Sequence, residues 1–336
     1  MGARFSSFKQ AQTKAHNDTF EFDIATVDSP TLRDSDVLVK VHAAALNPVD
    51  HVVSRGVLKD LWPEAEKLPF TPGYDFSGKI VRKGRAVKGF HHGQMVCGVQ
   101  WGTGSKGGRY HADDEEGGPC GGSLAEYIRV PVSSLVKVPK GMSPETAAAL
   151  SMVCQTAYQG LFDYNSIKSG DKVIIFGGTT AVGQIAIQLA KNMRCNVFAT
   201  CSTGKIDFVK ALGATPIDYT KQSWWEAEKG FDAGFCTTIG DSDAAHLKDD
   251  GAFKPGAILS SILTAGPATE EGTPKVVKFV FHQDAKALQQ MVDDAAAGKL
   301  KIEINKTWKG LTAENLKEMF TEQKTAKSLG KNVLVL

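Results

Sequence analysis

Glycine and hydroxyl residues with the spacing of a phosphate-binding turn occur near the middle of the chain. The turn reads GGTTAVG, and Gly178, Thr180 and Gly183 occupy the three fixed places of the pattern G-x-G-x-x-G. Glycines let a backbone approach a pyrophosphate closely, and the free N–H groups that begin a helix receive its negative charge. The pattern predicts a dinucleotide contact, with a tight turn before an ordinary packed helix as the alternative. The predicted contacts are Gly178, Thr179, Thr180, Ala181, Val182 and Gly183.

A second polar group follows the turn. In NAD sites an acid about 20 residues past the glycines usually binds the ribose 2′-hydroxyl. Here that place reads TCSTGK, from Thr200 to Lys205, and contains no acid. A carboxylate would repel a 2′-phosphate, whereas hydroxyls and a lysine would bind it. The stretch therefore favours NADPH, held by Ser202 and Lys205, although a solvated lysine at a helix start is the alternative for Lys205.

These residues need a strand before the turn and a helix after it. Residues 173–176 (VIIF) are an apolar run suited to a buried parallel strand. Beyond the turn, Val182, Ala186 and Leu189 share one face at helical spacing. A strand (196–201), a helix (206–212) and a short strand (216–218) follow, with further alternation through 231–237 and 257–263. Repeated βα units predict an α/β fold with a doubly wound parallel sheet.

The segments on either side have a different pattern. Residues 20–53 are strand-like with polar breaks, which suits a largely antiparallel, barrel-like domain. Short strands are expected at 79–82, 93–99 and 125–130, and the long glycine-rich loop 102–122 is interpreted as a functional lid or a surface insertion. Towards the carboxyl end we expect a strand-prone run (275–281), a helix (285–297), a strand (301–308) and a helix (311–323).

Composition limits the classes of function. The 336 residues, 42% of them apolar, suit two domains. A net charge of +2 without basic blocks gives no reason to expect nucleic acid as a partner. No apolar run reaches the roughly 18 residues of a membrane span and no signal peptide is evident, so we expect a cytoplasmic protein. Six cysteines without a C-x-x-C pair argue against a disulfide framework or a zinc knuckle.

Several separate motifs occur in one order along the chain. They are NPVD from Asn47, PGYDFSG from Pro72, GGSLAEY from Gly121, QTAY from Gln155 and the GGTTAVG turn. In this order the chain resembles medium-chain dehydrogenase/reductases, and most of all their zinc-independent branch of quinone oxidoreductases and enone or enoyl reductases. The resemblance implies a GroES-like β-barrel-type catalytic domain from residues 1–140 and 290–336, and a Rossmann NADP-binding domain from 141–289. It also implies an active site in the cleft.

The resemblance also bears on metals. Zinc-dependent relatives carry a cysteine where this chain has Asn47, a histidine where it has Tyr74, and a cysteine or another ligand near Met152. These residues do not supply the thiolate and imidazole set of a catalytic zinc, so no metal is expected. A site formed by His91, His92, His111 and Cys120 is the alternative, against exposed loop histidines.

Without zinc, hydride transfer to a quinone or an α,β-unsaturated carbonyl needs donors that stabilise the growing negative charge on oxygen. The resemblance places Asn47 against the nicotinamide ribose, with an Asn-Pro turn residue as the alternative. Tyr74 is a candidate catalytic donor, or packs against the cofactor. The further cofactor contacts that the resemblance implies are Thr156, Tyr219, Ile262, Leu263 and Lys331.

The resemblance leaves three functions open. The first is an NADPH-dependent reductase of quinones or conjugated enones. The second is an enoyl-thioester reductase of polyketide or fatty-acid type, and the third is a cofactor-binding protein without significant turnover. Relatives pair strands like 275–281 across a two-fold axis, which implies a homodimer; a covered edge strand is the alternative.

Overall fold

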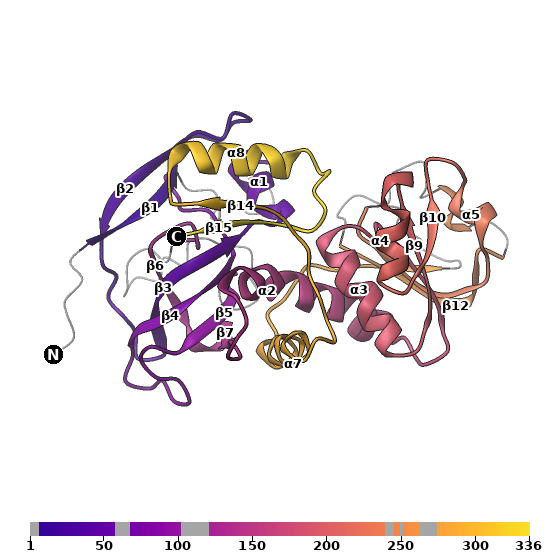
Figure 1. Ribbon diagram of the computed structural model, residues 1–336, viewed down its shortest axis with the longest axis horizontal. Coiled ribbons are helices and arrows are strands. Elements are labelled where there is room, and N and C mark those ends of the chain that lie inside the picture. Colours follow the sequence, from indigo (N-terminus) through magenta and orange to yellow (C-terminus); the bar gives the residue numbers. More distant parts are fainter. Residues whose placement is uncertain (1–6, 58–67, 102–120, 239–244, 249–250, 263–273) are drawn as a thin grey trace. The chain divides into compact units, whose positions relative to one another are not determined.

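The computed structural model describes residues 7–57, 68–101, 121–238, 245–248, 251–262 and 274–336 (Figure 1). The chain divides into two compact units. Unit 1 comprises Met1–Met152, His282–Ala296 and Glu303–Leu336, so both ends of the chain contribute to it. Unit 2 comprises Val153–Phe281 and Ala297–Ile302.

Unit 2 is built on a six-stranded sheet with the order β10-β9-β8-β11-β12-β13, and every neighbouring pair is parallel. The core of β8 is buried because Val173, Ile174 and Ile175 are fully covered. This sheet confirms the predicted doubly wound α/β fold. The strands are β8 (Lys172–Phe176), β9 (Asn196–Cys201), β10 (Thr215–Asp218), β11 (Phe231–Cys236), β12 (Phe253–Ser261) and β13 (Lys275–Lys278).

Helices connect these strands as crossovers. The chain enters unit 2 along α2 (Pro144–Tyr158) and a π-helical turn, η2 (Gln159–Tyr164). The connecting helices are α3 (Ala181–Asn192), η3 (Thr203–Lys205), α4 (Ile206–Ala211), α5 (Trp224–Ala227) and η4 (Ala245–Lys248). The strand order reverses between β8 and β11, and α/β sheets bind ligands outside the carboxyl ends of strands at such a point. The glycine turn follows β8 at that end.

Unit 1 is mainly antiparallel. A seven-stranded sheet has the order β14-β15-β3-β4-β5-β7, with β6 also paired to β3, and β1 pairs with β2 in a separate ribbon. The strands are β1 (Ser7–Thr13), β2 (Phe22–Asp28), β3 (Asp36–Ala45), β4 (Asp75–Lys83), β5 (Met95–Val99), β6 (Tyr127–Pro131), β7 (Leu135–Lys137), β14 (Ile304–Lys309) and β15 (Lys331–Val335). They are accompanied by α1 (Pro48–Ser54), the 3₁₀ turn η1 (Val132–Ser134), α7 (Ala285–Ala296), α8 (Ala313–Lys324) and the first part of α2.

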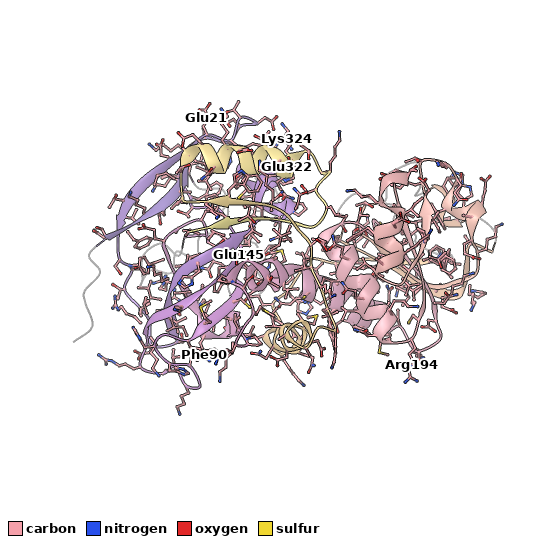
Figure 2. All side chains as sticks on the ribbon, in the orientation of Figure 1. Glu21, Phe90, Glu145, Arg194, Glu322 and Lys324 are labelled. Carbon is pink, nitrogen blue, oxygen red and sulfur yellow. The ribbon has the colours of Figure 1, made fainter. Side chains whose placement is uncertain are left out.

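Helix α8 lies against β2, β14 and β15 (Figure 1). It begins at the N-cap Thr312, whose hydroxyl accepts a hydrogen bond from the N–H of Asn315. Phe320 is fully buried against Phe20 and Phe22, and removing such a ring costs about 3–5 kcal/mol. At the other end of the helix, Lys324 pairs with Asp18 at 3.2 Å (Figure 2).

Most expected elements are confirmed, with shifted ends. The helix expected at 285–297 is α7, the one expected at 311–323 is α8, and the strand expected at 301–308 begins only at Ile304. The strand-prone run 275–281 forms a strand only from Lys275 to Lys278, and the ring of the following Phe279 stacks on that of Tyr164 with 4.4 Å between the ring centroids. Residues 102–120 of the expected lid lie outside the described residues. Of the helices that the structure describes, none is long and apolar enough to cross a membrane.

Candidate functional site

The glycine turn has the geometry of a phosphate cradle. Gly177 follows β8 with φ of +86°, a conformation that favours glycine. A Cβ on Gly178 would lie 2.7 Å from the Cβ of Ala199, and one on Gly183 would lie 2.1 Å from the carbonyl oxygen of Gly177. Glycine is therefore required where the turn packs against β9 and where α3 packs on the turn.

Thr180 takes the middle place of the pattern, because its side chain caps α3. Its hydroxyl accepts a hydrogen bond from the N–H of Gly183 and donates one to the carbonyl of Gly177, both at 2.9 Å. The N–H groups of Ala181 and Val182, at the first two helical positions, have no acceptor within the helix. The donors and the space of this turn fit a pyrophosphate.

The region expected to hold a 2′-phosphate lies beyond β9 and β10. Ser202 is followed by the single 3₁₀ turn η3, which ends at the half-buried Lys205. Tyr219 follows β10, and its side chain is 62% exposed. The backbone N–H of Tyr219 donates to the carbonyl of Cys201 at 3.1 Å, so the two loops lie side by side.

An acid that the sequence analysis missed lies between these loops. Asp218 accepts hydrogen bonds from the hydroxyl of Thr203 at 2.6 Å and from the hydroxyl of Thr220 at 2.7 Å. The bond from Thr203, followed by those from Thr220, lowers the pKa of this carboxyl. The stretch 200–205 indeed has no acid, but β10 runs parallel to β9 with Asp218 opposite Cys201. Only this pairing of β10 with β9 reveals that Asp218 lies beside the stretch 200–205. Because Thr203 donates its hydroxyl hydrogen to Asp218, that hydrogen is not available to a phosphate.

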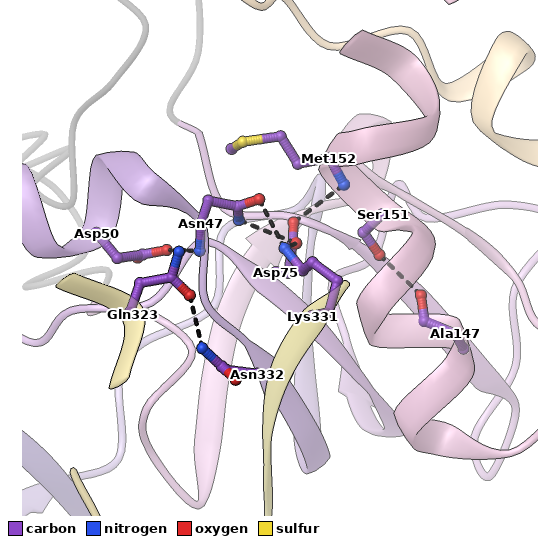
Figure 3. Close-up of polar contacts among 9 residues, drawn as sticks. All are labelled: Asn47, Asp50, Asp75, Ala147, Ser151, Met152, Gln323, Lys331 and Asn332. Carbon is purple, nitrogen blue, oxygen red and sulfur yellow. Dashed lines mark hydrogen bonds and ion pairs between the residues drawn. The ribbon is translucent and has the colours of Figure 1, made fainter. Parts of the chain in front are cut away.

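Unit 1 contains a buried polar cluster of Asn47, Asp75 and Lys331 (Figure 3). The ammonium of Lys331 donates to Oδ1 of Asn47 at 2.6 Å and to Oδ2 of Asp75 at 2.8 Å. The amide nitrogen Nδ2 of Asn47 donates to the same carboxylate oxygen at 3.0 Å. Asp75 is fully buried, and Asn47 and Lys331 are 3% and 2% exposed.

Strand register brings the three residues together. Ala45, near the end of β3, lies opposite Asp75 of β4, and it also lies opposite Val333 of β15. Asn47 comes two residues after Ala45, and Lys331 two residues before Val333, so their side chains meet beside Asp75. Asn47 is the N-cap of α1, and its backbone N–H donates to the carboxylate of Asp50 at 2.6 Å.

The electrostatics of Asp75 depend on its donors. Burial is the largest influence and raises the pKa of the Asp75 carboxyl above its ordinary value, while the Lys331 ammonium, the Asn47 amide and the backbone N–H of Met152 oppose this rise. The Met152 N–H donates to Oδ1 at 3.1 Å, so both carboxylate oxygens accept hydrogen bonds. Because every neighbour donates, the ionised carboxylate is the form that this arrangement holds.

Two of the three positions at which the resemblance implies a zinc ligand contact this acid. Asn47 and Met152 contact Asp75 directly, and Tyr74 precedes it in the chain. The Tyr74 side chain is fully buried, with its ring 5.0 Å from that of Trp101. Among the residues that the structure describes, no group of three or more His, Cys, Asp or Glu side chains could hold a metal ion. Of the alternative set, His91 and His92 are exposed, and His111 and Cys120 lie outside the described residues.

The remaining expected contacts belong to unit 2. Thr156 lies on α2 and is 5% exposed. Ile262 follows β12, and its N–H donates to the carbonyl of Cys236 at 3.3 Å. Leu263 lies outside the described residues. The structure thus gathers the turn, Ser202, Lys205 and Tyr219 at the carboxyl ends of β8, β9 and β10 of unit 2, and Asn47 with Lys331 in unit 1.

Comparisons with known proteins cover both units. The alcohol dehydrogenase GroES-like domain family matches residues 33–140. The chain is 31% identical over 328 residues to the 2-methylene-furan-3-one reductase of Solanum lycopersicum, covering 95% of this chain and 78% of that protein. It is also 31% identical to the NADPH-dependent alkenal/one oxidoreductase, chloroplastic, of Arabidopsis thaliana, covering 87% of this chain and 71% of that protein.

Two further comparisons concern a shorter match and a solved structure. The chain is 36% identical over 192 residues to the trans-enoyl reductase pgmF of Aspergillus terreus, covering 55% of this chain and 49% of that protein. The structure of the quinone oxidoreductase from Coxiella burnetii superposes with a TM-score of 0.84 at 26% identity, over 98% of this chain and 99% of that one.

Proposed function

Because the chain belongs to the medium-chain dehydrogenase/reductase superfamily, we propose that it reduces quinones or α,β-unsaturated carbonyl compounds with NADPH. The observation that carries this proposal is the identity over 328 residues with a reductase whose named substrate is a conjugated methylene ketone. The glycine turn after β8 supports it independently, because its free donors and its lack of Cβ atoms fit a dinucleotide.

Each unit contributes its own residues to the reaction. In unit 2 the turn from Gly178 to Gly183 binds the pyrophosphate, and Ser202, Lys205 and Tyr219 bind the 2′-phosphate. Bound NADPH supplies the hydride. In unit 1 the amide of Asn47 donates a hydrogen bond to the nicotinamide half of the cofactor. Thr156 and Ile262, with Leu263, complete the cofactor contacts in this proposal.

We further propose that no zinc takes part in the reaction. The residues at the three expected ligand positions are an amide, a phenol and a thioether, a donor set that does not match a catalytic zinc. Asn47 is also engaged with Lys331 and Asp75. Tyr74 packs against Trp101 in unit 1, so its role in the proposal is packing beside the reactants rather than proton donation.

The substrate class is tested by a panel of small quinones, enones and enoyl thioesters with NADPH. Fastest turnover with quinones or enones supports the proposal. Fastest turnover with enoyl thioesters supports the second candidate, which the partial identity to a trans-enoyl reductase favours. Binding of NADPH without turnover on any compound supports a cofactor-binding protein.

Assembly and location complete the proposal. We propose a homodimer through the β13 side of unit 2, supported by the exposed Val280 beside that strand, whose side chain is 55% exposed. We keep the cytoplasm as the proposed location, although the names of three relatives place those proteins in the chloroplast or its envelope. Fractionation of cells that express the tagged full chain tests this location.

A further inference from the structure

The side-chain amide of Asn47 is held at both ends by groups of opposite charge (Figure 3). Its oxygen accepts from the Lys331 ammonium at 2.6 Å, and its nitrogen donates to the Asp75 carboxylate at 3.0 Å. Lys331 and Asp75 also bond to each other at 2.8 Å, which closes a triangle of three buried side chains. The Asn47 side chain also takes part in the capping box at the start of α1, in which it faces the backbone N–H of Asp50.

This arrangement permits one orientation of the amide. Turning the amide by 180° would aim its NH₂ group at the ammonium and its carbonyl oxygen at the carboxylate. Both contacts would then be repulsive, whereas in the observed orientation both are charge-assisted hydrogen bonds. The electrostatic difference is large because the three side chains are at most 3% exposed, where water screens little.

The orientation decides what Asn47 presents to a ligand. An amide nitrogen carries two hydrogens, and one of them is used on Asp75. The second is the donor that remains. The carbonyl oxygen points to Lys331 and cannot accept from a ligand. The free N–H of Asn47 therefore favours a ligand group that accepts a hydrogen bond over one that donates.

We propose that Asp75 and Lys331 are positioning residues that hold Asn47 as a hydrogen-bond donor towards an acceptor oxygen on the nicotinamide half of the cofactor. This inference rests on the proposed function, in which Asn47 contacts that half. It also gives Lys331 a different role from the direct cofactor contact expected from the sequence. The ammonium acts on Asn47 and Asp75, which use two of its three hydrogens.

The expected kinetic effect falls on turnover more than on binding. In the proposed function the turn and Lys205 hold the phosphates of NADPH, and the variants leave both unchanged. Asp75→Asn and Lys331→Met should therefore lower kcat by at least about tenfold and change the KM for NADPH by less than about threefold, because misplacement at the reacting centre reduces the rate steeply. The control is Asp36→Asn, which removes one partner of a second buried pair of unit 1, Arg129 with Asp36 at 3.5 Å. It should lower the melting temperature and leave kcat unchanged.

Two further variants separate positioning from stability. In an Asn47→Ala background, Asp75→Asn should have little additional effect on kcat, because Asp75 acts through the Asn47 amide. If a single variant does not fold, the double variant Asp75→Asn/Lys331→Met carries the test, because it removes both buried charges together. This double variant should still show the loss of kcat.

The experiment is steady-state kinetics of the full chain with NADPH and the best compound of the substrate panel, together with thermal unfolding of each variant. A loss of kcat that disappears in the Asn47→Ala background supports the inference. If the Asp75→Asn and Lys331→Met variants fold and keep the wild-type kcat, the inference is overturned. It is also overturned if Asp75→Asn lowers kcat by the same factor in the wild type and in the Asn47→Ala background. A wild-type protein that turns over no compound of the panel overturns the proposed function and this inference together.

Discussion

The threonine in the middle of the glycine pattern shows how one hydroxyl can take the place of a glycine. Thr180 satisfies the N–H of Gly183 and bonds to the carbonyl of Gly177, so it closes the turn and begins the helix. In the proposed function the neighbouring N–H groups of Ala181 and Val182 bind the pyrophosphate. At this position the departure from the pattern therefore stabilises the cradle and leaves its donors available.

Removing this cap should destabilise the protein. Thr180→Ala is expected to lower the free energy of unfolding by about 1 kcal/mol, within a range of about 0.5–2 kcal/mol, because the N–H of Gly183 loses its acceptor. Thermal or urea unfolding of the two proteins measures the difference. Thr179→Ala is the matched control, because the Thr179 side chain does not cap α3. The backbone carbonyl of Thr179, which accepts a hydrogen bond from the Gln184 side chain, is retained in this variant. Equal destabilisation by both substitutions would contradict this role.

In the proposed function, cofactor choice depends on Lys205, the one cation of the η3 turn. Hydrogen bonds to charged groups contribute roughly 1.5–3 kcal/mol, which at about 1.4 kcal/mol per tenfold is about a 10- to 150-fold effect. Lys205→Ala should raise the KM for NADPH by that factor and leave the KM for NADH almost unchanged. Lys210→Ala, on the exposed side of α4, is the control and should change neither value. A wild type that prefers NADH, or equal harm to both cofactors, would reject this assignment.

At the scale of elements, α1 and α8 meet through charged side chains. Asp18 pairs with Arg55 at the end of α1 and with Lys324 at the end of α8. His51 of α1 lies close to these cations. Burial, and then the positive charges of Arg55 and Lys324, lower the pKa of His51 below its ordinary value of 6.5. The folded protein therefore holds this imidazole neutral.

This arrangement predicts a stability that falls as the pH is lowered. A histidine with a depressed pKa in the fold stabilises the protein above the unfolded value of 6.5, and the contribution is lost as the pH falls towards the folded pKa. The free energy of unfolding should therefore decrease between about pH 7.5 and 5.5, and the slope should be smaller in His51→Gln. Urea unfolding at several pH values measures it. His42, whose pKa is also lowered, should supply the remaining slope, and the exposed His91→Gln serves as a control. An unchanged slope in His51→Gln would refute the assignment.

The elements were largely predictable because their signals are local. The apolar run of β8, the periodic face of α3 and the glycines between them occur within about 20 residues of one another. The cluster in unit 1 has no such signal. Asn47 and Asp75 are 28 positions apart and Asp75 and Lys331 are 256 apart, and only the register of β3, β4 and β15 brings them together. Asp218 was missed for the same reason, since strand pairing places it beside Thr203.

At the scale of the whole molecule, the two units carry the two halves of the proposed reaction. The proposed domain limits, 1–140 with 290–336 and 141–289, remain a prediction. Neither half needs a metal in the proposal. In unit 1 the ammonium of Lys331, the amide of Asn47 and the carboxylate of Asp75 are bonded to one another, and Asn47 is one of the three positions where the resemblance implies a zinc ligand in zinc-dependent proteins. The buried cation of this cluster is supplied by the chain itself, as Lys331.

Chelation should therefore leave the enzyme active. After exhaustive treatment with a strong chelator, we expect full NADPH-dependent activity, unchanged on adding zinc, and no stoichiometric zinc by elemental analysis. The physical reason is that the amide, phenol and thioether of Asn47, Tyr74 and Met152 are weak ligands for this ion. One tightly bound zinc per chain that turnover requires would overturn the proposed mechanism.

The proposed dimer follows from the last strand of the parallel sheet. Strand β13 is at the end of the strand order, and beyond it buried Phe279 and Phe281 alternate with Val280, whose side chain is 55% exposed. The unpaired backbone groups of a terminal strand can pair with a strand of another chain, and in the proposed dimer this pairing would cover Val280. In sedimentation velocity at micromolar concentration we expect a dimer for the wild type and a shift towards monomer for Val280→Asp, because a buried charge would be unpaired at the interface. Met193→Asp, at another exposed apolar side chain of unit 2, should remain dimeric. If the wild type is a fully active monomer, the proposed dimer is wrong. If Val280→Asp and Met193→Asp dissociate the dimer equally, the interface is not at β13.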